Sequence, residues 1–273
     1  MKLWEFKKQI HRYLKVFFRL LKIELMTSMQ YRLNFLFSFI ATLSWLICEL
    51  LFIHYFMKSY ITLAGWNEYQ IGILIGVNQL WVGGVFYFMF WPSLTTFADM
   101  IRHGEADKLF TLPVKTRFYI STFKTDWTSL FISINGLFLL IYCIVKLSIT
   151  LSFLNTLYCI ILISLSSWII YCLFFITVCS VFWIVEAGSI LYFVNVVDTL
   201  TRYPYEIYRR GIFFFIFTFV IPITVISNVP TRALIGILDF KFVLYEIIIT
   251  VIFTILSEII WRKGLKIYES YSS

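Results

Sequence analysis

Very few side chains in the apolar parts of this sequence are able to take part in chemistry. Glu49 lies inside the apolar stretch 33–57, and Asn78 and Gln79 lie inside the next one. A charge at the centre of a bilayer costs about 2.5–3.5 kcal/mol on insertion scales, so such a Glu is protonated, paired or turned into a helix bundle. Two interpretations of Glu49 stay open: part of a path for a transported molecule, or a protonated carboxyl bonded to a neighbouring helix.

Small residues surround the two amides. Gly72 and Gly76 have GxxxG spacing, and Gly83 follows Asn78 and Gln79 closely. Small residues let membrane helices approach each other, and amide side chains bond across such contacts. We therefore take Glu49, Gly76, Asn78, Gln79 and Gly83 as candidates for a translocation path or for a packing face.

Sequence signatures of catalysis are missing. The chain contains no GxxxxGK[ST] phosphate-binding loop, no HExxH and no GxSxG. Its three histidines, His11, His54 and His103, lie far apart, and its five cysteines fall in apolar stretches without a CxxC pair. We expect no catalytic site, no metal site and no cofactor bound directly by this chain.

The elements that must position these residues are long apolar stretches. Hydrophobic residues make up 60% of the 273 residues and charged residues 14%, against about 45–50% and about 25% in soluble domains. A helix needs about 17–25 apolar residues to cross a bilayer. The sequence predicts an all-α integral membrane protein with six spans, near 33–57, 71–91, 127–145, 156–184, 212–229 and 242–261.

The positive charge is distributed unevenly between the loops. Of the 23 Lys and Arg residues, all but Lys58, Lys146, Arg232 and Lys241 fall in the first 32 residues, the second and fourth loops and the tail. Since Lys and Arg stay on the cytoplasmic side, we expect both termini inside, in the plasma (inner) membrane. The net charge of +8 suits anionic lipid rather than nucleic acid.

One region is ambiguous. Residues 152–200 are long enough for nearly two passes, and a second pass would make seven spans and place the basic C-terminal tail outside. The charge rule disfavours that arrangement. We therefore interpret 186–200 as an extension on the cytoplasmic side or as an interfacial helix.

The first residues predict an amphipathic helix over 3–24. A basic face opposite an aromatic-rich face is typical of a helix lying in the membrane interface, although a cytosolic helix packed on a partner protein has the same pattern. The residues of the two faces that we expect to matter most are Phe6, Ile10, Tyr13 and Phe17 on the apolar side and Arg12 and Arg19 on the basic side.

The second loop mixes charges of both signs with apolar residues. Gly104 interrupts a helix there, and Asp107 is placed to begin a short one. A short helix with exposed apolar residues, held between two spans, suits docking into a groove of a soluble partner; the alternative is an ordinary polar loop. The candidate docking residues are Arg102, Gly104, Glu105, Asp107, Leu109, Phe110, Leu112 and Pro113.

Three motifs together resemble the ABC-2 transporter family, in its branch of small six-span permeases. Residues 104–113 resemble the family's Gly-x-x-Asp-x-Leu-Leu-x-x-Pro loop, with Phe110 in place of the second Leu. Residues 203–208, followed by Pro222 and Pro230, resemble its tyrosine–proline segment, and 261–270 resemble its closing Gly-Leu-x-x-Tyr-x-Ser motif. The likeness covers nearly the whole chain.

The resemblance implies partners. Such permeases pair with a second copy or a homologous permease subunit, and two ATP-binding subunits carry ATP and Mg²⁺ on the cytoplasmic face. It implies that 104–113 form the coupling helix and 3–24 the interface helix of an exporter. The apolar, aromatic interior of the chain suits a hydrophobic or amphipathic substrate. The expected single domain comprises residues 1–32, a bundle over 33–261 and a cytoplasmic tail over 262–273.

Two other classes of protein compete with this interpretation. A stand-alone secondary transporter or channel usually has several ionisable groups at mid-membrane, where we expect Glu49 to be nearly alone. A membrane-embedded enzyme needs clustered His, Asp or Cys at one interface, a feature that the sequence lacks.

Overall fold

A computed structural model describes residues 3–59, 62–150, 152–184 and 188–272. Five helical stretches are long and apolar enough to cross a membrane, Arg32–Tyr55, Glu68–Arg102, Trp127–Lys146, Phe153–Phe182 and Phe240–Tyr268, and a bent helix pair brings the number to six if it counts as one span. The prediction of an all-α integral membrane protein is confirmed.

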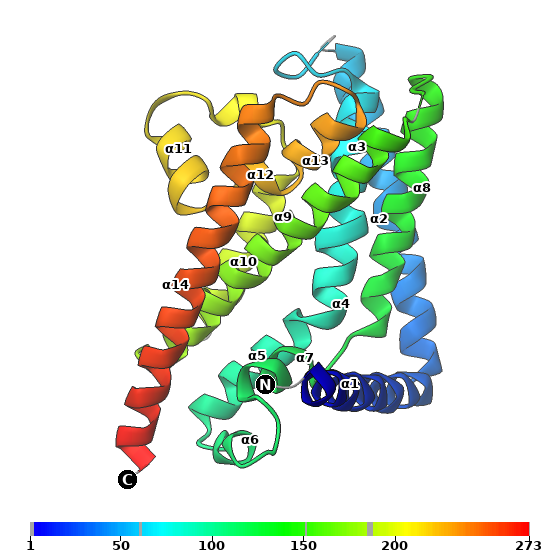
Figure 1. Cartoon of the computed structure of the whole chain (residues 1–273). Helices are drawn as coiled ribbons and strands as arrows, with labels where there is room; N and C mark the ends of the chain where they lie inside the picture. Colours follow the sequence, from blue (N-terminus) through cyan, green and yellow to red (C-terminus); the bar gives the residue numbers. More distant parts are fainter. Residues whose placement is uncertain (1–2, 60–61, 151, 185–187, 273) are drawn as a thin grey trace.

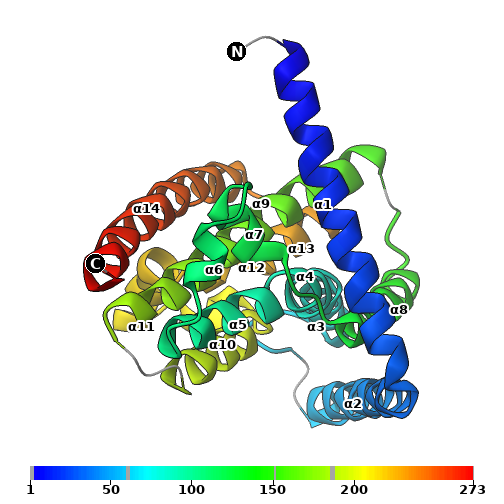
Figure 2. The ribbon, with the colours of Figure 1, turned by 90° about the horizontal axis from the view of Figure 1, so that it is seen from below.

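The bundle has two distinct ends (Figure 1). Helix α1 (Leu3–Gln30) lies across one end, roughly perpendicular to the other helices, and the last turns of α14 (Phe240–Ser272) reach the same end. We call this the terminal end and the opposite one the far end. Seen from below, α1 crosses one side of the terminal end, while α5, α6 and α7 lie nearer its centre (Figure 2).

The chain first crosses in α2 (Arg32–Ser59) and returns in α3 (Glu68–Asn78). A capping box starts α3: the backbone N–H of Gln70 donates to Asn67 Oδ1 at 2.9 Å, and that of Asn67 donates to Gln70 Oε1 at 3.0 Å. The π-helical stretch η1 (Gln79–Phe86), α4 (Tyr87–Met89) and α5 (Trp91–Arg102) continue to the terminal end.

The remaining elements follow in order. They are α6 (Asp107–Phe110), α7 (Thr116–Thr122), η2 (Trp127–Ser129), α8 (Leu130–Lys146), α9 (Phe153–Cys179), η3 (Ser180–Phe182), α10 (Gly188–Thr201), η4 (Tyr205–Tyr208), α11 (Gly211–Phe215), η5 (Ile216–Val220), α12 (Ile223–Ile226) and α13 (Asn228–Leu234).

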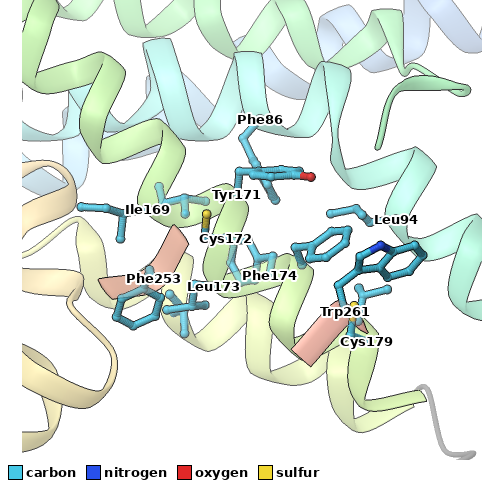
Figure 3. Close-up of a cluster of buried hydrophobic side chains, with 14 of the residues drawn as sticks. Phe86, Leu94, Ile169, Tyr171, Cys172, Leu173, Phe174, Cys179, Phe253 and Trp261 are labelled. Atoms are coloured by element: carbon cyan, nitrogen blue, oxygen red, sulfur yellow. The ribbon is translucent and has the colours of Figure 1, made fainter. Parts of the chain in front are cut away.

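Helix α9 forms the centre of the core (Figure 3). Its Phe174 and Phe175 are buried, and the Phe175 ring centroid lies 5.6 Å from that of Trp261 on α14. Phe86 of η1 packs on Phe174 from the other side, with ring centroids 4.9 Å apart. Because lipid is as apolar as these side chains, close packing rather than removal from water holds the helices together.

Glycines bring α3 and η1 against α8. A Cβ on Gly76 would lie 3.0 Å from the carbonyl oxygen of Gly136, and one on Gly83 would lie 2.8 Å from Ile132. Ser133 donates a hydrogen bond to the Leu80 carbonyl at 2.8 Å across the same contact. The small residues at Gly76 and Gly83 thus lie where two membrane helices touch.

The fifth crossing differs from the prediction. The apolar stretch 212–229, expected as a span, is a helix pair bent by 71° at Ile221 and Pro222. Pro222 has no N–H to donate to a helix ladder, and its ring prevents the helix from continuing. Both ends of the pair lie at the far end, since Glu206 before it and Arg232 near its end form an ion pair. The pair is therefore re-entrant.

Helix α10 and η4 carry the chain across instead. The connection after α9 lies at the terminal end, where Phe182 packs against Tyr268 of α14 with ring centroids 6.1 Å apart. At the other end of the crossing, Trp66 Nε1 donates to Glu206 at 3.2 Å. The interpretation of 186–200 as a cytoplasmic extension or an interfacial helix is wrong for the described part, 188–200, while 186–187 lie outside the described residues.

This correction moves Arg209 and Arg210 to the far end and places Arg202 on the crossing itself, beside Asp198. Arg202, Arg209 and Arg210 belong to the fourth loop, which the charge rule placed with the termini. The sequence signal failed because α10 has only 14 residues and includes Asp198, so it never forms a long uncharged apolar run. In the described residues, α10 replaces the expected fifth crossing, and α1 and the end of α14 lie at the same end of the bundle.

Candidate functional site

Residues 102–113 form a compact segment at the terminal end. Helix α5 ends at Arg102, and Gly104 adopts φ +70°, a conformation that favours glycine. The N–H of Glu105 then donates to the Met100 carbonyl at 2.8 Å, which closes the turn. The four-residue helix α6 follows, so the predicted break at Gly104 and the start near Asp107 lie where the sequence suggested.

The apolar residues of this segment face inward. Leu109 is 5% exposed, and Phe110 and Leu112 are half-buried, whereas we expected exposed apolar side chains. The exposed surface is made by the polar residues and the turn: Arg102, Gly104, Glu105, Asp107 and Pro113. Apolar contacts thus hold the segment against its own bundle, and its charged groups are left exposed, where a partner protein can bind them.

Helix α1 holds one side of the segment. Arg12 donates a hydrogen bond to the Pro113 carbonyl at 2.9 Å, and the backbone N–H of Lys115 donates to Tyr13 Oη at 3.2 Å. The Tyr13 ring packs on Phe118 with centroids 4.9 Å apart. The structure therefore brings the two predicted elements, 3–24 and 104–113, into contact.

Phe17 and Arg19, also predicted on α1, show no hydrogen bond or ring contact with the segment in the described part of the chain. Phe17 is half-buried and stacks edge-on against Phe18, and Arg19 is exposed. The side chains of Phe6 and Ile10 lie outside the described part of the chain.

The last turns of α14 hold the segment from the other side. Tyr268 Oη donates to Asp107 Oδ1 at 2.8 Å, and its ring centroid lies 5.1 Å from that of Phe110. The helix continues through the residues that we expected to form a separate tail after Trp261. Three elements far apart in sequence, α1, α6 and α14, thus meet in one surface, which we call the terminal-end surface.

Sequence reasoning missed the residue that connects this surface to the core. Arg117 of α7 donates to Glu258 at 2.8 Å and to Ser257 at 2.8 Å, both on α14, and its guanidinium lies 4.4 Å from the Phe175 ring of α9. Burial tends to lower the pKa of Arg117, but Tyr171 and Glu258 outweigh it and the pKa is raised. The only signal was a lone Arg just before an apolar stretch.

A second group of polar residues lies near the middle of the membrane. Glu49 accepts a hydrogen bond from Gln79 Nε2 and lies 3.7 Å from Arg202, which forms a closer ion pair with Asp198 at 2.8 Å. Asn78 is about ten residues into α3, or about 15 Å from its start. We call Glu49, Asn78, Gln79, Asp198 and Arg202 the mid-membrane cluster.

Hydrogen bonds tie this cluster to the re-entrant pair. Asn78 Nδ2 donates to Thr201 Oγ1 at 2.7 Å and to Ser227 Oγ at 3.1 Å. The expectation that Glu49 is nearly alone at this depth is wrong, because α10 contributes Asp198 and brings Arg202 to it. Sequence reasoning missed both since it placed α10 outside the membrane.

Arg232 links several elements at the far end. Its guanidinium forms an ion pair with Glu206 and lies 4.7 Å from the ring centroid of Tyr205, 5.2 Å from that of Trp66 and 5.4 Å from that of Phe242. Stacking of a cation on aromatic rings is favourable. The contacts join the loop after α2, η4, α13 and the start of α14.

Among the residues that the structure describes, no three His, Cys, Asp or Glu side chains gather in a way that would hold a metal ion.

Comparison with known proteins supports the resemblance. The family model described as "ABC-2 family transporter protein" matches residues 43–272, which is more than half of the chain. No match was found among curated proteins or among solved structures. The matched range includes the second loop, the mid-membrane cluster and α14, and begins after α1. The chain therefore belongs to the ABC-2 family of transporter proteins and is a multi-pass membrane component of an ABC transporter, a class that works with ATP-binding subunits and is not itself catalytic.

Proposed function

We propose that this chain is the permease subunit of an exporter that moves a hydrophobic or amphipathic molecule. Two ATP-binding subunits bind the terminal-end surface, and a second copy of this chain or a homologous permease completes the path. ATP and Mg²⁺ bind the partner subunits. In this proposal the terminal end is cytoplasmic, both termini are inside and the membrane is the plasma (inner) membrane.

One observation carries the proposal: the exposed segment 102–113 is held at once by Arg12 and Tyr13 of α1 and by Tyr268 of α14. A short segment tied to an interfacial helix and to the last membrane helix cannot move alone. Force applied to its exposed side by a partner passes to both elements.

Arg117 links the segment to the membrane-spanning helices. It follows the segment directly and bonds to Ser257 and Glu258 of α14. Movement of the segment therefore pulls on α14 and, through Phe175, on α9. Because packed interiors respond by discrete shifts rather than by gradual deformation, such a pull changes the contact between the crossing helices.

Co-purification with a co-expressed phosphate-loop ATPase tests the proposal. The double variant Arg102→Glu, Glu105→Lys reverses two exposed charges while leaving Leu109 in place. We expect the wild-type chain to retain the ATPase and the double variant to lose it. The matched control Arg209→Glu, Arg210→Glu reverses two exposed charges at the far end and should retain the ATPase.

Two results would contradict the proposal. Retention of the ATPase by the Arg102→Glu, Glu105→Lys variant with unchanged yield would contradict the docking assignment. Uphill transport by the purified chain in vesicles without any ATPase would favour the stand-alone secondary transporter or channel instead.

A further inference from the structure

The mid-membrane cluster contains two carboxyl groups and one guanidinium. Two carboxylates, Glu49 and Asp198, share the single guanidinium of Arg202. We propose that this cluster binds the protonated amine of a cationic amphiphile, and that Glu49 is the carboxylate that receives it. The inference rests on the proposed function only in taking that amphiphile as the exporter's cargo.

The geometry singles out Glu49 from the pair. Arg202 Nη2 lies 2.8 Å from Asp198 Oδ2, which is the distance of a charge-assisted hydrogen bond, whereas Arg202 Nη1 lies 3.7 Å from Glu49. Asp198 is also four residues before Arg202 on the same helix, so this pair is local and persists when helices move. Glu49, on a different helix, is the carboxyl group without a close cation partner.

The cluster is rich in hydrogen-bond acceptors that have no donor. Asn78 Oδ1, Gln79 Oε1 and Asp198 Oδ1 are buried without a partner, and their side chains belong to residues that are 0%, 3% and 8% exposed. One donor, Arg202 Nε, is unpartnered beside them. Leaving a buried polar atom unpaired is unfavourable. An ammonium group, with three donors and no acceptor, suits this surplus of acceptors.

The position of α2 explains how such a ligand reaches Glu49. None of the span-length stretch of α2 is buried within the chain, and Trp45 and Leu51 on it are 64% and 50% exposed. The outward face of α2 is therefore apolar and open, which suits an alkyl chain, while Glu49, 12% exposed, lies on the inward face of the same helix. A molecule with an amine head and an alkyl tail satisfies both the cluster and this surface, whereas a small inorganic cation satisfies only the first.

The chain offers a matched control carboxyl. Glu246 on α14 is fully buried, accepts a hydrogen bond from Ser166 Oγ at 2.7 Å and belongs to a different part of the bundle. It shares the residue type of Glu49 and a place on a membrane-length helix, but it pairs with Ser166 rather than with Arg202. A cation that binds Glu49 specifically should ignore a change at Glu246.

Binding of radiolabelled dodecylamine to the purified full chain in phosphatidylcholine nanodiscs tests the inference, with empty nanodiscs giving the lipid background. We expect saturable binding that Glu49→Gln weakens by about tenfold or more, since it removes one charge-assisted contact. Glu49→Asp keeps the charge and should stay within about threefold of wild type. Glu246→Gln should bind as the wild type does, and unlabelled dodecanol, which has no charge, should compete poorly.

A second variant covers the case in which Glu49→Gln fails to fold. Asp198→Asn releases Arg202 to pair with Glu49, so it too should weaken binding. Equal binding by wild type and Asp198→Asn, equal binding by wild type and Glu49→Gln, equal competition by dodecanol, or no saturable binding would each overturn the inference. The assay contains neither ATPase nor ATP, so its failure is separate from a failure of ATPase docking.

Discussion

The terminal-end surface and the mid-membrane cluster use charge in opposite ways. At the terminal end, Arg102 and Glu105 are exposed, and the segment is fixed by the buried Leu109 and by two neighbouring helices, α1 and α14. In the cluster, Asp198 and Arg202 are largely buried and pair with each other. The first arrangement leaves charges available for a partner protein. The second makes the charges part of the bundle itself.

This difference predicts which substitutions affect partner binding and which affect the stability of the fold. An exposed ion pair contributes little to folding, so changes at Arg102 or Glu105 should affect binding alone. Removing one partner of a buried pair leaves an uncompensated charge, so changes in the cluster should affect the fold as well.

The largest expected effect tests this contrast directly. Arg202→Met leaves Glu49 and Asp198 together without a cation, and we expect it to lower the free energy of unfolding by about 3 kcal/mol or more. Arg102→Met, the surface counterpart, should change it by less than about 0.5 kcal/mol. Thermal unfolding of both variants in the same detergent measures the difference. Equal unfolding temperatures would remove the distinction between the two regions.

A smaller effect is expected where the terminal-end surface connects to the core of the bundle. Arg117→Met removes hydrogen bonds to Ser257 and Glu258 but keeps an apolar side chain against Phe175, and should destabilise the chain by about 2 kcal/mol. Lys115→Met, two residues away and exposed, is the control. The double variant Arg117→Met, Glu258→Gln should lose less free energy of unfolding than the two single variants lose together. Full additivity would show that Arg117 and Glu258 act independently.

The smallest effect lies within the terminal-end surface. Tyr268→Phe removes the hydrogen bond to Asp107 but keeps the ring on Phe110, so we expect a loss of about 1 kcal/mol or less. Hydrogen exchange should become faster at the amides of 107–110 and stay unchanged in α9. Tyr158→Phe, half-exposed on α9, is the control. Unchanged exchange at 107–110 would mean that α14 does not hold the segment.

Much of the architecture could be predicted because long apolar runs are local. The first four and the last of the predicted spans overlap membrane-length helices, and the break at Gly104 lies between α5 and α6. The fifth crossing could not be predicted in this way, because α10 is short and contains Asp198, whereas the re-entrant pair looks like a span until Pro222 bends it.

In the candidate site, too, the local features could be predicted from the sequence and the long-range contacts could not. The sequence predicted residues 3–24 and 104–113 as two separate elements that both serve the partner ATPase, but not their contact. The hydrogen bond from Arg12 to Pro113 joins them across 101 positions. Glu49 and Gln79 stood out in the sequence, but Arg202 did not, because its importance comes from a helix placed elsewhere. Long-range pairing of this kind is a property of the folded bundle.

The central claim is that a partner ATPase binds the terminal-end surface, on the side opposite the loop around Arg209. Site-specific photo-crosslinking in cells tests it most directly, with a benzophenone amino acid placed at Glu105 in one sample and at Arg209 in another. The account predicts an ATPase adduct from position 105 and none from position 209. An adduct from position 209, or none from position 105 at normal expression of both proteins, would contradict it.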